Sequence, residues 1–108
     1  MNWQFTALSF TEKDGSIKVS SDQLDLVENA PTEYEAWMKL GKSILEYARE
    51  FNVDFEFRGG APNRKKHIPY VLKALNINDV EIIGDLIIIN KVSKSQVIEW
   101  YGTGLFQW

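Results

Sequence analysis

The strongest pattern in this sequence is a run of apolar residues at helical spacing between Thr32 and Phe51. Charged residues occupy the opposite side of the same run. Thr32 can cap the first turn with Glu35 completing a capping box, and Asn52 is suited to a left-handed end. The apolar positions recur over about five turns, at Tyr34, Trp37, Met38, Gly41, Ile44, Leu45, Ala48 and Phe51. The pattern predicts one long amphipathic helix with a wide apolar stripe.

Length and composition indicate an ordinary globular protein. A chain of 108 residues is expected to form one domain over 1–108 and to bury a core without a metal or a disulfide. The absence of cysteine excludes thiol catalysis and cysteine-based zinc sites. We find no signal-peptide pattern at the N-terminus, and the most apolar stretch, 80–89, is too short to span a bilayer. We therefore expect a soluble, cytoplasmic protein without a cofactor or metal.

The segments before the long helix suggest a β-hairpin. Residues 2–10 are rich in aromatic and β-branched types, which favours a strand, and the alternation shifts phase near Ala7, as at a bulge. Residues 13–16 form a turn that leads into a second strand over 17–20. Residues 21–28 fit either a short helical turn or an extended segment.

The segments after the long helix alternate between strand and helix patterns. A strand is expected over 53–58, then a helix from His67 or Ile68 to Asn76 with Pro69 in its first turn. Two arms over 80–83 and 86–89 flank Gly84 and Asp85 as a hairpin, and a last helix runs from 93 to 101. The order is β-β-α-β-α-β-β-α. The fold class is α+β, a mostly antiparallel sheet of about five strands packed on one long and two shorter helices.

Charge is distributed unevenly along the chain. Residues 1–57 hold eleven acids and five bases, whereas residues 58–108 hold four acids and seven bases. Glu33, Glu35, Glu46 and Glu50 lie on the predicted long helix. They form either a solvated outer face or a surface that attracts a basic protein partner.

The C-terminal end is crowded with aromatic residues. Tyr101 and Trp108 are of the types enriched at protein interfaces. They either pack onto the sheet or, if exposed, form a homodimer contact or an anchor for another protein.

The segment 58–67 carries the densest basic cluster, at Arg58, Arg64, Lys65, Lys66 and His67. Glycines at its start and a helix at its end could seat a phosphate or a nucleic-acid backbone. It matches neither a P-loop nor a dinucleotide-binding fingerprint, and a solvated loop is the plainer interpretation. His67, the only histidine, reads as a surface or capping residue.

Two carboxylates and a cation alternate along the strand expected at 53–58. Asp54, Glu56 and Arg58 would share one face, and such a set can hold a divalent metal beside a phosphodiester. Alternation alone also produces this pattern on the wet face of a half-buried strand.

These observations favour a protein that is not an enzyme. The leading hypothesis is a protein-binding module, most plausibly a stoichiometric inhibitor: an immunity protein, an antitoxin or an anti-defence protein from a bacterium or phage. Glu33, Glu35, Glu46 and Glu50 would steer the partner, and Tyr101 and Trp108 would anchor it. Phosphate binding through 58–67 is the alternative, and a nuclease using Asp54 and Glu56 is more remote. We expect no membrane contact.

Overall fold

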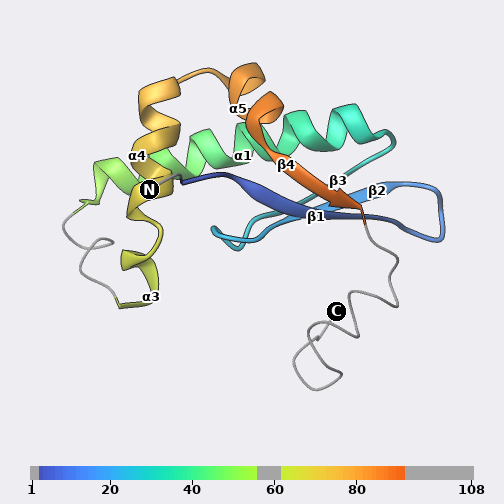
Figure 1. Cartoon of the computed structure of the whole chain (residues 1–108), viewed down its shortest axis with the longest axis horizontal. Helices are drawn as coiled ribbons and strands as arrows, with labels where there is room; N and C mark the ends of the chain where they lie inside the picture. The colour runs from blue at the N-terminus through green and yellow to red at the C-terminus, as the bar shows by residue number, and fades with distance from the viewer. Residues whose placement is uncertain (1–2, 56–61, 92–108) are drawn as a thin grey trace.

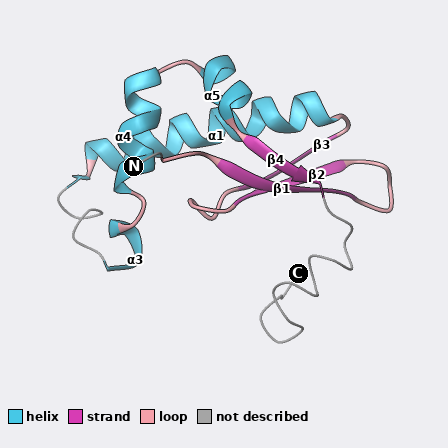
Figure 2. Cartoon of the chain, viewed as in Figure 1, coloured by secondary structure: helices cyan, strands magenta, loops and turns pink. Residues whose placement is uncertain are grey.

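A computed structural model describes residues 3–55 and 62–91 of the chain. The described elements are β1 Thr6–Thr11, β2 Ile17–Ser21, β3 Val27–Ala30, α1 Glu33–Val53, α3 Pro62–Lys65, α4 Ile68–Ile77, α5 Val80–Leu86 and β4 Ile88–Lys91. The helices α1, α4 and α5 lie on one side of the described sheet (Figures 1 and 2). The α+β class is confirmed. The predicted order and the count of about five strands are not, because three strands precede α1 and the described sheet has four.

The sheet has the strand order β3-β2-β1-β4. β1–β2 and β2–β3 are antiparallel pairs, whereas β1–β4 is parallel. The sheet is therefore mixed, with antiparallel pairing in the majority. β1 lies inside the sheet, between β2 and β4.

The predicted N-terminal hairpin is confirmed. A tight turn joins its strands, with Gly15 in the left-handed region (φ +89°) and the backbone N–H of Glu12 donating to the carbonyl of Ser16 at 2.8 Å. The expected bulge near Ala7 is wrong, since pairing runs without interruption from Ala7↔Ser21 to Thr11↔Ile17. The phase shift has another cause: residues 7–10 are all buried, so both faces of β1 are covered.

Residues 21–28, which fitted either a helical turn or an extended segment, fold as a turn followed by the start of β3. The buried Ser21 hydroxyl accepts the N–H of Leu24 at 3.2 Å. The N–H of Ser21 itself donates to the carbonyl of Leu26 at 2.7 Å. Asp25 adopts a left-handed conformation (φ 58°), which aspartate tolerates better than most residues. The turn thus reverses the chain and lets β3 pair with β2.

The long helix is confirmed, including its cap. The hydroxyl of Thr32 accepts the N–H of Glu35 at 3.2 Å, and Glu33 and Glu35 place negative charge in the first turn. Its buried face consists of Ala36, Leu40, Gly41, Ile44, Leu45, Ala48 and Phe51. This face packs on the sheet and on α4 and α5, and it supplies six of the fifteen residues of the buried core cluster, more than any other element.

The end of α1 differs from the prediction. Asn52 does not stop the helix, which continues to Val53 and ends at Asp54 with φ −121°, outside the left-handed region. The strand expected over 53–58 is therefore wrong where the structure describes it. Val53 is 89% exposed in the last turn of α1, and Phe55 packs edge-to-face on Phe51 with ring centroids 5.7 Å apart. Residues 56–58 lie outside the described part of the chain.

The helix predicted to run from His67 or Ile68 to Asn76 is α4, and its bounds agree with the prediction to within one residue. α4 begins at Ile68, has Pro69 in its first turn and ends at Ile77. Asn78 closes it in the left-handed conformation (φ 51°), and its N–H donates to the carbonyl of Ala74 at 2.8 Å.

The hairpin expected over 80–89 is wrong. Asp79 accepts the N–H of Ile82 at 3.0 Å and starts a helix, α5, which runs through the expected turn at Gly84. Gly84 faces α1 rather than solvent: a Cβ placed on Gly41 would lie 3.0 Å from the Gly84 nitrogen. Glycine at this point lets two helices approach closely. Only Ile88–Lys91 forms a strand, and it joins β1 in parallel. The helix expected over 93–101 and the aromatic tail lie outside the described residues.

Candidate functional site

The exposed face of α1 carries three of the four glutamates predicted to meet a partner. Acidic and basic side chains share this exposed face, and they are Glu35, Lys39, Lys42, Glu46, Arg49 and Glu50. Lys42 and Glu46, one helical turn apart, form an ion pair of 3.9 Å. The three acids are therefore interleaved with three bases, and the face as a whole is close to neutral.

Glu33 is separated from the other three glutamates. Its Oε1 lies 2.9 Å from the ammonium nitrogen of Lys91, so the start of α1 is ion-paired to the end of β4. This pair joins the acidic N-terminal half of the sequence to the basic C-terminal half. Opposite charges separated along the chain are thus partly neutralised within the fold.

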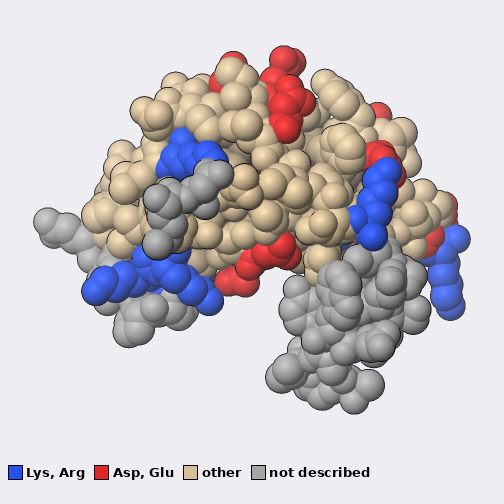
Figure 3. Space-filling model, in the orientation of Figure 1, with Lys and Arg blue, Asp and Glu red and all other residues tan. Residues whose placement is uncertain are grey.

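Acidic and basic side chains are also intermixed on the molecular face seen in Figure 3. Basic side chains gather at the lower left, around α3, and again at the right, whereas acidic side chains lie between these two groups and also at the top of the view (Figure 3). The asymmetry along the sequence therefore does not produce one acidic and one basic pole on this face.

The basic cluster of 58–67 is divided by the fold. Lys65 and Lys66 are exposed, whereas Arg64 is half-buried and His67 is fully buried. The guanidinium of Arg64 stacks on the ring of Tyr47 at 5.9 Å and donates to its hydroxyl at 3.2 Å. Arg58 lies outside the described residues. Two of the five predicted anion-binding residues, Arg64 and His67, thus contact Tyr47 of α1.

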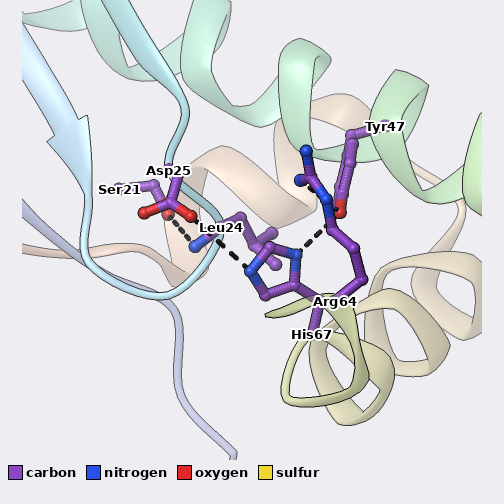
Figure 4. A network of polar contacts seen from close by, with 6 residues as sticks. All are labelled: Ser21, Leu24, Asp25, Tyr47, Arg64 and His67. Atoms are coloured by element: carbon purple, nitrogen blue, oxygen red, sulfur yellow. Dashed lines mark hydrogen bonds and ion pairs between the residues drawn. The ribbon is translucent and has the colours of Figure 1, made fainter. Parts of the chain in front are cut away.

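His67 is the centre of a polar network between three parts of the chain (Figure 4). Its Nδ1 lies 2.7 Å from the Tyr47 hydroxyl of α1, and its Nε2 lies 3.8 Å from a carboxylate oxygen of Asp25, in the turn before β3. The prediction of a surface histidine is wrong. Although His67 precedes α4, its side chain makes no capping bond.

Burial controls the protonation of His67. Desolvation lowers the pKa of His67 below its usual value of 6.5, the Asp25 charge raises it, and the Arg64 and Lys66 charges lower it. Because Arg64 donates to the Tyr47 oxygen, the Tyr47 hydroxyl proton is free to point at Nδ1. The hydrogen-bond pattern therefore assigns the proton of the neutral ring to Nε2, facing Asp25.

The carboxylate pair proposed for metal binding does not rest on a strand. Asp54 caps the C-terminus of α1, and Glu56 and Arg58 lie outside the described residues. Across residues 3–55 and 62–91, no group of three or more His, Asp or Glu side chains is arranged to hold a metal ion.

A groove between the N-terminal segment and α4 was missed by sequence reasoning. Trp3 packs edge-to-face on Tyr70 with centroids 5.7 Å apart, and the ammonium of Lys73 donates to the Trp3 carbonyl at 2.6 Å. The groove has a volume of about 580 Å³ and is lined by Trp3, Ile68, Pro69, Leu72, Lys73 and Asn76. Only tertiary packing brings Trp3 to α4, so no local pattern could have revealed it.

The predicted aromatic anchors, Tyr101 and Trp108, lie outside the described residues. Within the described ranges, no helix is both long enough and apolar enough to cross a membrane.

The described part of the chain forms a small α+β domain with a four-stranded mixed sheet covered by one long and two shorter helices. Residues 1–89 match the family model PHD_like, described as the antitoxin of a RelE/RelB toxin–antitoxin system. This chain belongs to that PHD-like antitoxin family. The family agrees with the sequence-based prediction of a protein-binding inhibitor of antitoxin type, and with the prediction that the chain is not an enzyme.

A solved structure supports the assignment. A crystal structure from Syntrophomonas wolfei subsp. wolfei, of the antitoxin part of a proposed toxin/antitoxin system, superposes with a TM-score of 0.78 at 35% sequence identity. The match covers 84% of this chain and 65% of that chain, so this chain accounts for less than two thirds of the longer protein. No curated protein matches the sequence.

Proposed function

We propose that this chain neutralises a toxin protein by binding it directly, and that the toxin is of the RelE type named in the family description. The observation that carries the proposal is the family match over residues 1–89. The antitoxin from Syntrophomonas wolfei, 35% identical, supports it. The proposal includes a cytoplasmic location for both proteins, as expected from the sequence.

The surface proposed for the toxin combines charged residues of α1 with the aromatic tail. Glu35, Glu46 and Glu50 are exposed and available to a basic partner, and Glu33 becomes available if Lys91 is drawn away. Tyr101 and Trp108 would supply apolar anchors of the kind that dominate interface energies. Because bases share the α1 face, we expect its glutamates to set the orientation of the toxin more than its overall attraction.

A pull-down joined to a growth assay tests neutralisation. Tagged full-length chain is used to capture partners from its native lysate at low and at high salt after nuclease treatment. The proposal requires one protein that co-purifies in equal amounts at both salts, arrests growth when expressed alone, and ceases to do so when this chain is co-expressed. A captured protein that is harmless alone would contradict neutralisation. A nucleic-acid signal lost with salt would instead favour the basic segment.

Two triple variants, one removing acids and one removing bases from the exposed face of α1, test whether this face contacts the toxin. The triple variant Glu35→Gln, Glu46→Gln, Glu50→Gln should lower the association rate with a basic toxin by about 3- to 10-fold at low salt. The matched triple variant Lys39→Gln, Lys42→Gln, Arg49→Gln should raise it. Equal rates for both variants would remove α1 from the interface while leaving neutralisation itself intact.

A further inference from the structure

The corner formed by α3 and the first turn of α4, residues 62–70, has an unusual interior anchor. Between residues 64 and 70, His67 is fully buried, whereas every other residue is exposed or partly exposed. The buried residues of α4, Val71 and Ala74, lie after this corner. The side chain that fixes the corner to the interior is therefore a titratable imidazole rather than an apolar group.

The two ring nitrogens of His67 face different elements (Figure 4). Nδ1 lies 2.7 Å from the Tyr47 hydroxyl of α1, and the two rings pack edge-to-face with centroids 5.7 Å apart. Nε2 is buried, has no hydrogen-bond partner within the described part of the chain, and lies 3.8 Å from a carboxylate oxygen of the exposed Asp25. The ring is thus bonded to α1 on one side and faces a carboxylate on the other.

Protonation of the ring is incompatible with its bond to Tyr47. In the neutral ring Nδ1 accepts the Tyr47 proton, while the Tyr47 oxygen accepts from Arg64 at 3.2 Å. In the imidazolium both nitrogens carry a proton, so Nδ1 can no longer accept. Among the described residues the Tyr47 hydroxyl has no hydrogen-bond partner besides His67 and Arg64, and a guanidinium accepts no hydrogen bond. The Tyr47 proton would therefore lose its acceptor inside the protein, which is destabilising.

The charges around the ring determine the direction in which an imidazolium is drawn. The groups that face it are Asp25 from the turn before β3, Tyr47 from α1, Arg64 from α3, and Lys66, which precedes it in the chain. Arg64 and Lys66 repel a positive ring, and Asp25 attracts it. The attraction therefore comes from the side of the ring that Nε2 faces, away from Tyr47.

We propose that His67 is a proton-operated latch for the corner of residues 62–70. The neutral ring holds the corner closed through Tyr47, and the protonated ring releases Tyr47, turns toward Asp25 and lets the corner open while the sheet remains folded. Opening also frees Arg64 from Tyr47, so that Arg64 joins the exposed Lys65 and Lys66. Because burial lowers the pKa of His67 in the closed corner, the open corner binds the proton more tightly. Acid therefore shifts the equilibrium toward the open form as the pH falls below about 6.5.

Hydrogen exchange of the full-length chain measures the corner directly. The N–H groups of His67, Tyr70 and Val71 report on it, because they donate to the carbonyls of Arg64 and His67 at 2.9–3.1 Å. From about pH 7.5 to 5.5, after correction for the intrinsic pH dependence of exchange, their protection should fall about 3- to 10-fold. Their exchange should also be insensitive to low urea, unlike that of β1, because a local opening exposes little surface.

Three variants isolate the latch. Tyr47→Phe keeps the ring and removes the hydroxyl, so the corner should lose about 3- to 10-fold in protection already at neutral pH and change less on acidification. Tyr34→Phe is the matched control, because Tyr34 lies on the same helix with 62% of its surface exposed, and it should leave both properties unchanged. Asp25→Asn should move the opening to lower pH, since the Asp25 charge favours the imidazolium.

Nitrogen NMR of the one histidine in the chain connects the opening to the proton. Its signals should show the Nε2–H tautomer at neutral pH and should titrate together with the loss of protection. A ring that titrates while the protection of the corner stays constant would overturn the proposal. A corner that shares the protection and the urea dependence of β1 would also overturn it, because such a corner opens only when the whole domain unfolds. Equal behaviour of Tyr47→Phe and Tyr34→Phe would be a third contradiction.

Discussion

The close crossing of α1 and α5 makes a sharp prediction about two glycines. A Cβ on Gly41 would lie 2.9 Å from the carbonyl oxygen of Val80 and 3.0 Å from the nitrogen of Gly84, so it would meet backbone that cannot turn aside. A Cβ on Gly84 would meet mainly the end of the Met38 side chain, which is flexible. Both glycines are helical, so alanine improves local helix propensity at either position.

The two alanine variants should therefore differ in stability. For Gly41→Ala, overpacking costs about 1–3 kcal/mol, and the gain in propensity of up to about 1 kcal/mol offsets part of it. We expect a net loss of about 1–2 kcal/mol in the free energy of unfolding, or roughly 5–10 °C in Tm. Gly84→Ala should remain within about 0.5 kcal/mol of the natural chain, because Met38 can change rotamer.

Urea and thermal unfolding followed by circular dichroism measure both variants under the same conditions. The double variant Gly84→Ala, Met38→Ala removes the flexible contact and serves to show that the side chain, not the backbone, limits position 84. The reasoning is refuted if Gly41→Ala is as stable as the natural chain. It is equally refuted if the two single variants lose the same amount.

Three further predictions concern the cap, the core and the buried histidine. Thr32→Ala should cost about 1 kcal/mol in urea unfolding, whereas Thr32→Ser should cost much less, because serine keeps the capping oxygen. Phe51→Ala should cost about 3–5 kcal/mol, since Phe51 is fully buried, and a loss below 1 kcal/mol would show that the core collapses around the gap. Because burial lowers the pKa of His67, the unfolded chain takes up a proton first on acidification. Stability should fall as pH decreases from about 6.5 toward the lowered pKa. His67→Gln should lose less stability than the natural chain between pH 7 and 5.5, and parallel curves would contradict the assignment.

The elements that could be predicted are those whose signal is local. α1 combines a long helical period with a side-chain cap, and the first hairpin combines a turn sequence with two short strands. α4 was predicted to within one residue because Pro69 marks its first turn. In each case the residues that determine the structure are close together in the sequence.

The predictions that were wrong concern elements whose structure depends on contacts with residues distant in the sequence. The stretch around Gly84 is short and apolar throughout, so periodicity could not separate a strand from a buried helix. Its glycine suggested a turn, whereas its role is to let α1 approach. Val53 and Phe55 alternate with polar residues by coincidence, at the end of a helix.

The candidate site shows the same limit. Exposure of Glu35, Glu46 and Glu50 followed from the helical pattern and is observed. The burial of His67 could not be predicted, because it requires Tyr47 from α1 and Asp25 from the turn before β3. Asp79 caps α5, and an aspartate at this position is a sequence signal for the start of a helix. The interpretation of Gly84 and Asp85 as a hairpin turn led us to overlook it.

The parallel pairing of β1 with β4 also fixes when the fold can be completed during synthesis. The pairing joins Thr6 to Ile88, so one side of the second strand from the edge stays open until nearly all of the described chain has been made. Contacts this distant in sequence slow folding and leave unpaired strand edges exposed in the meantime. A nascent chain released before Ile88 would carry β1 as an open edge and would be a ready substrate for chaperones and proteases. The described sheet can therefore be completed only after the ribosome has translated β4.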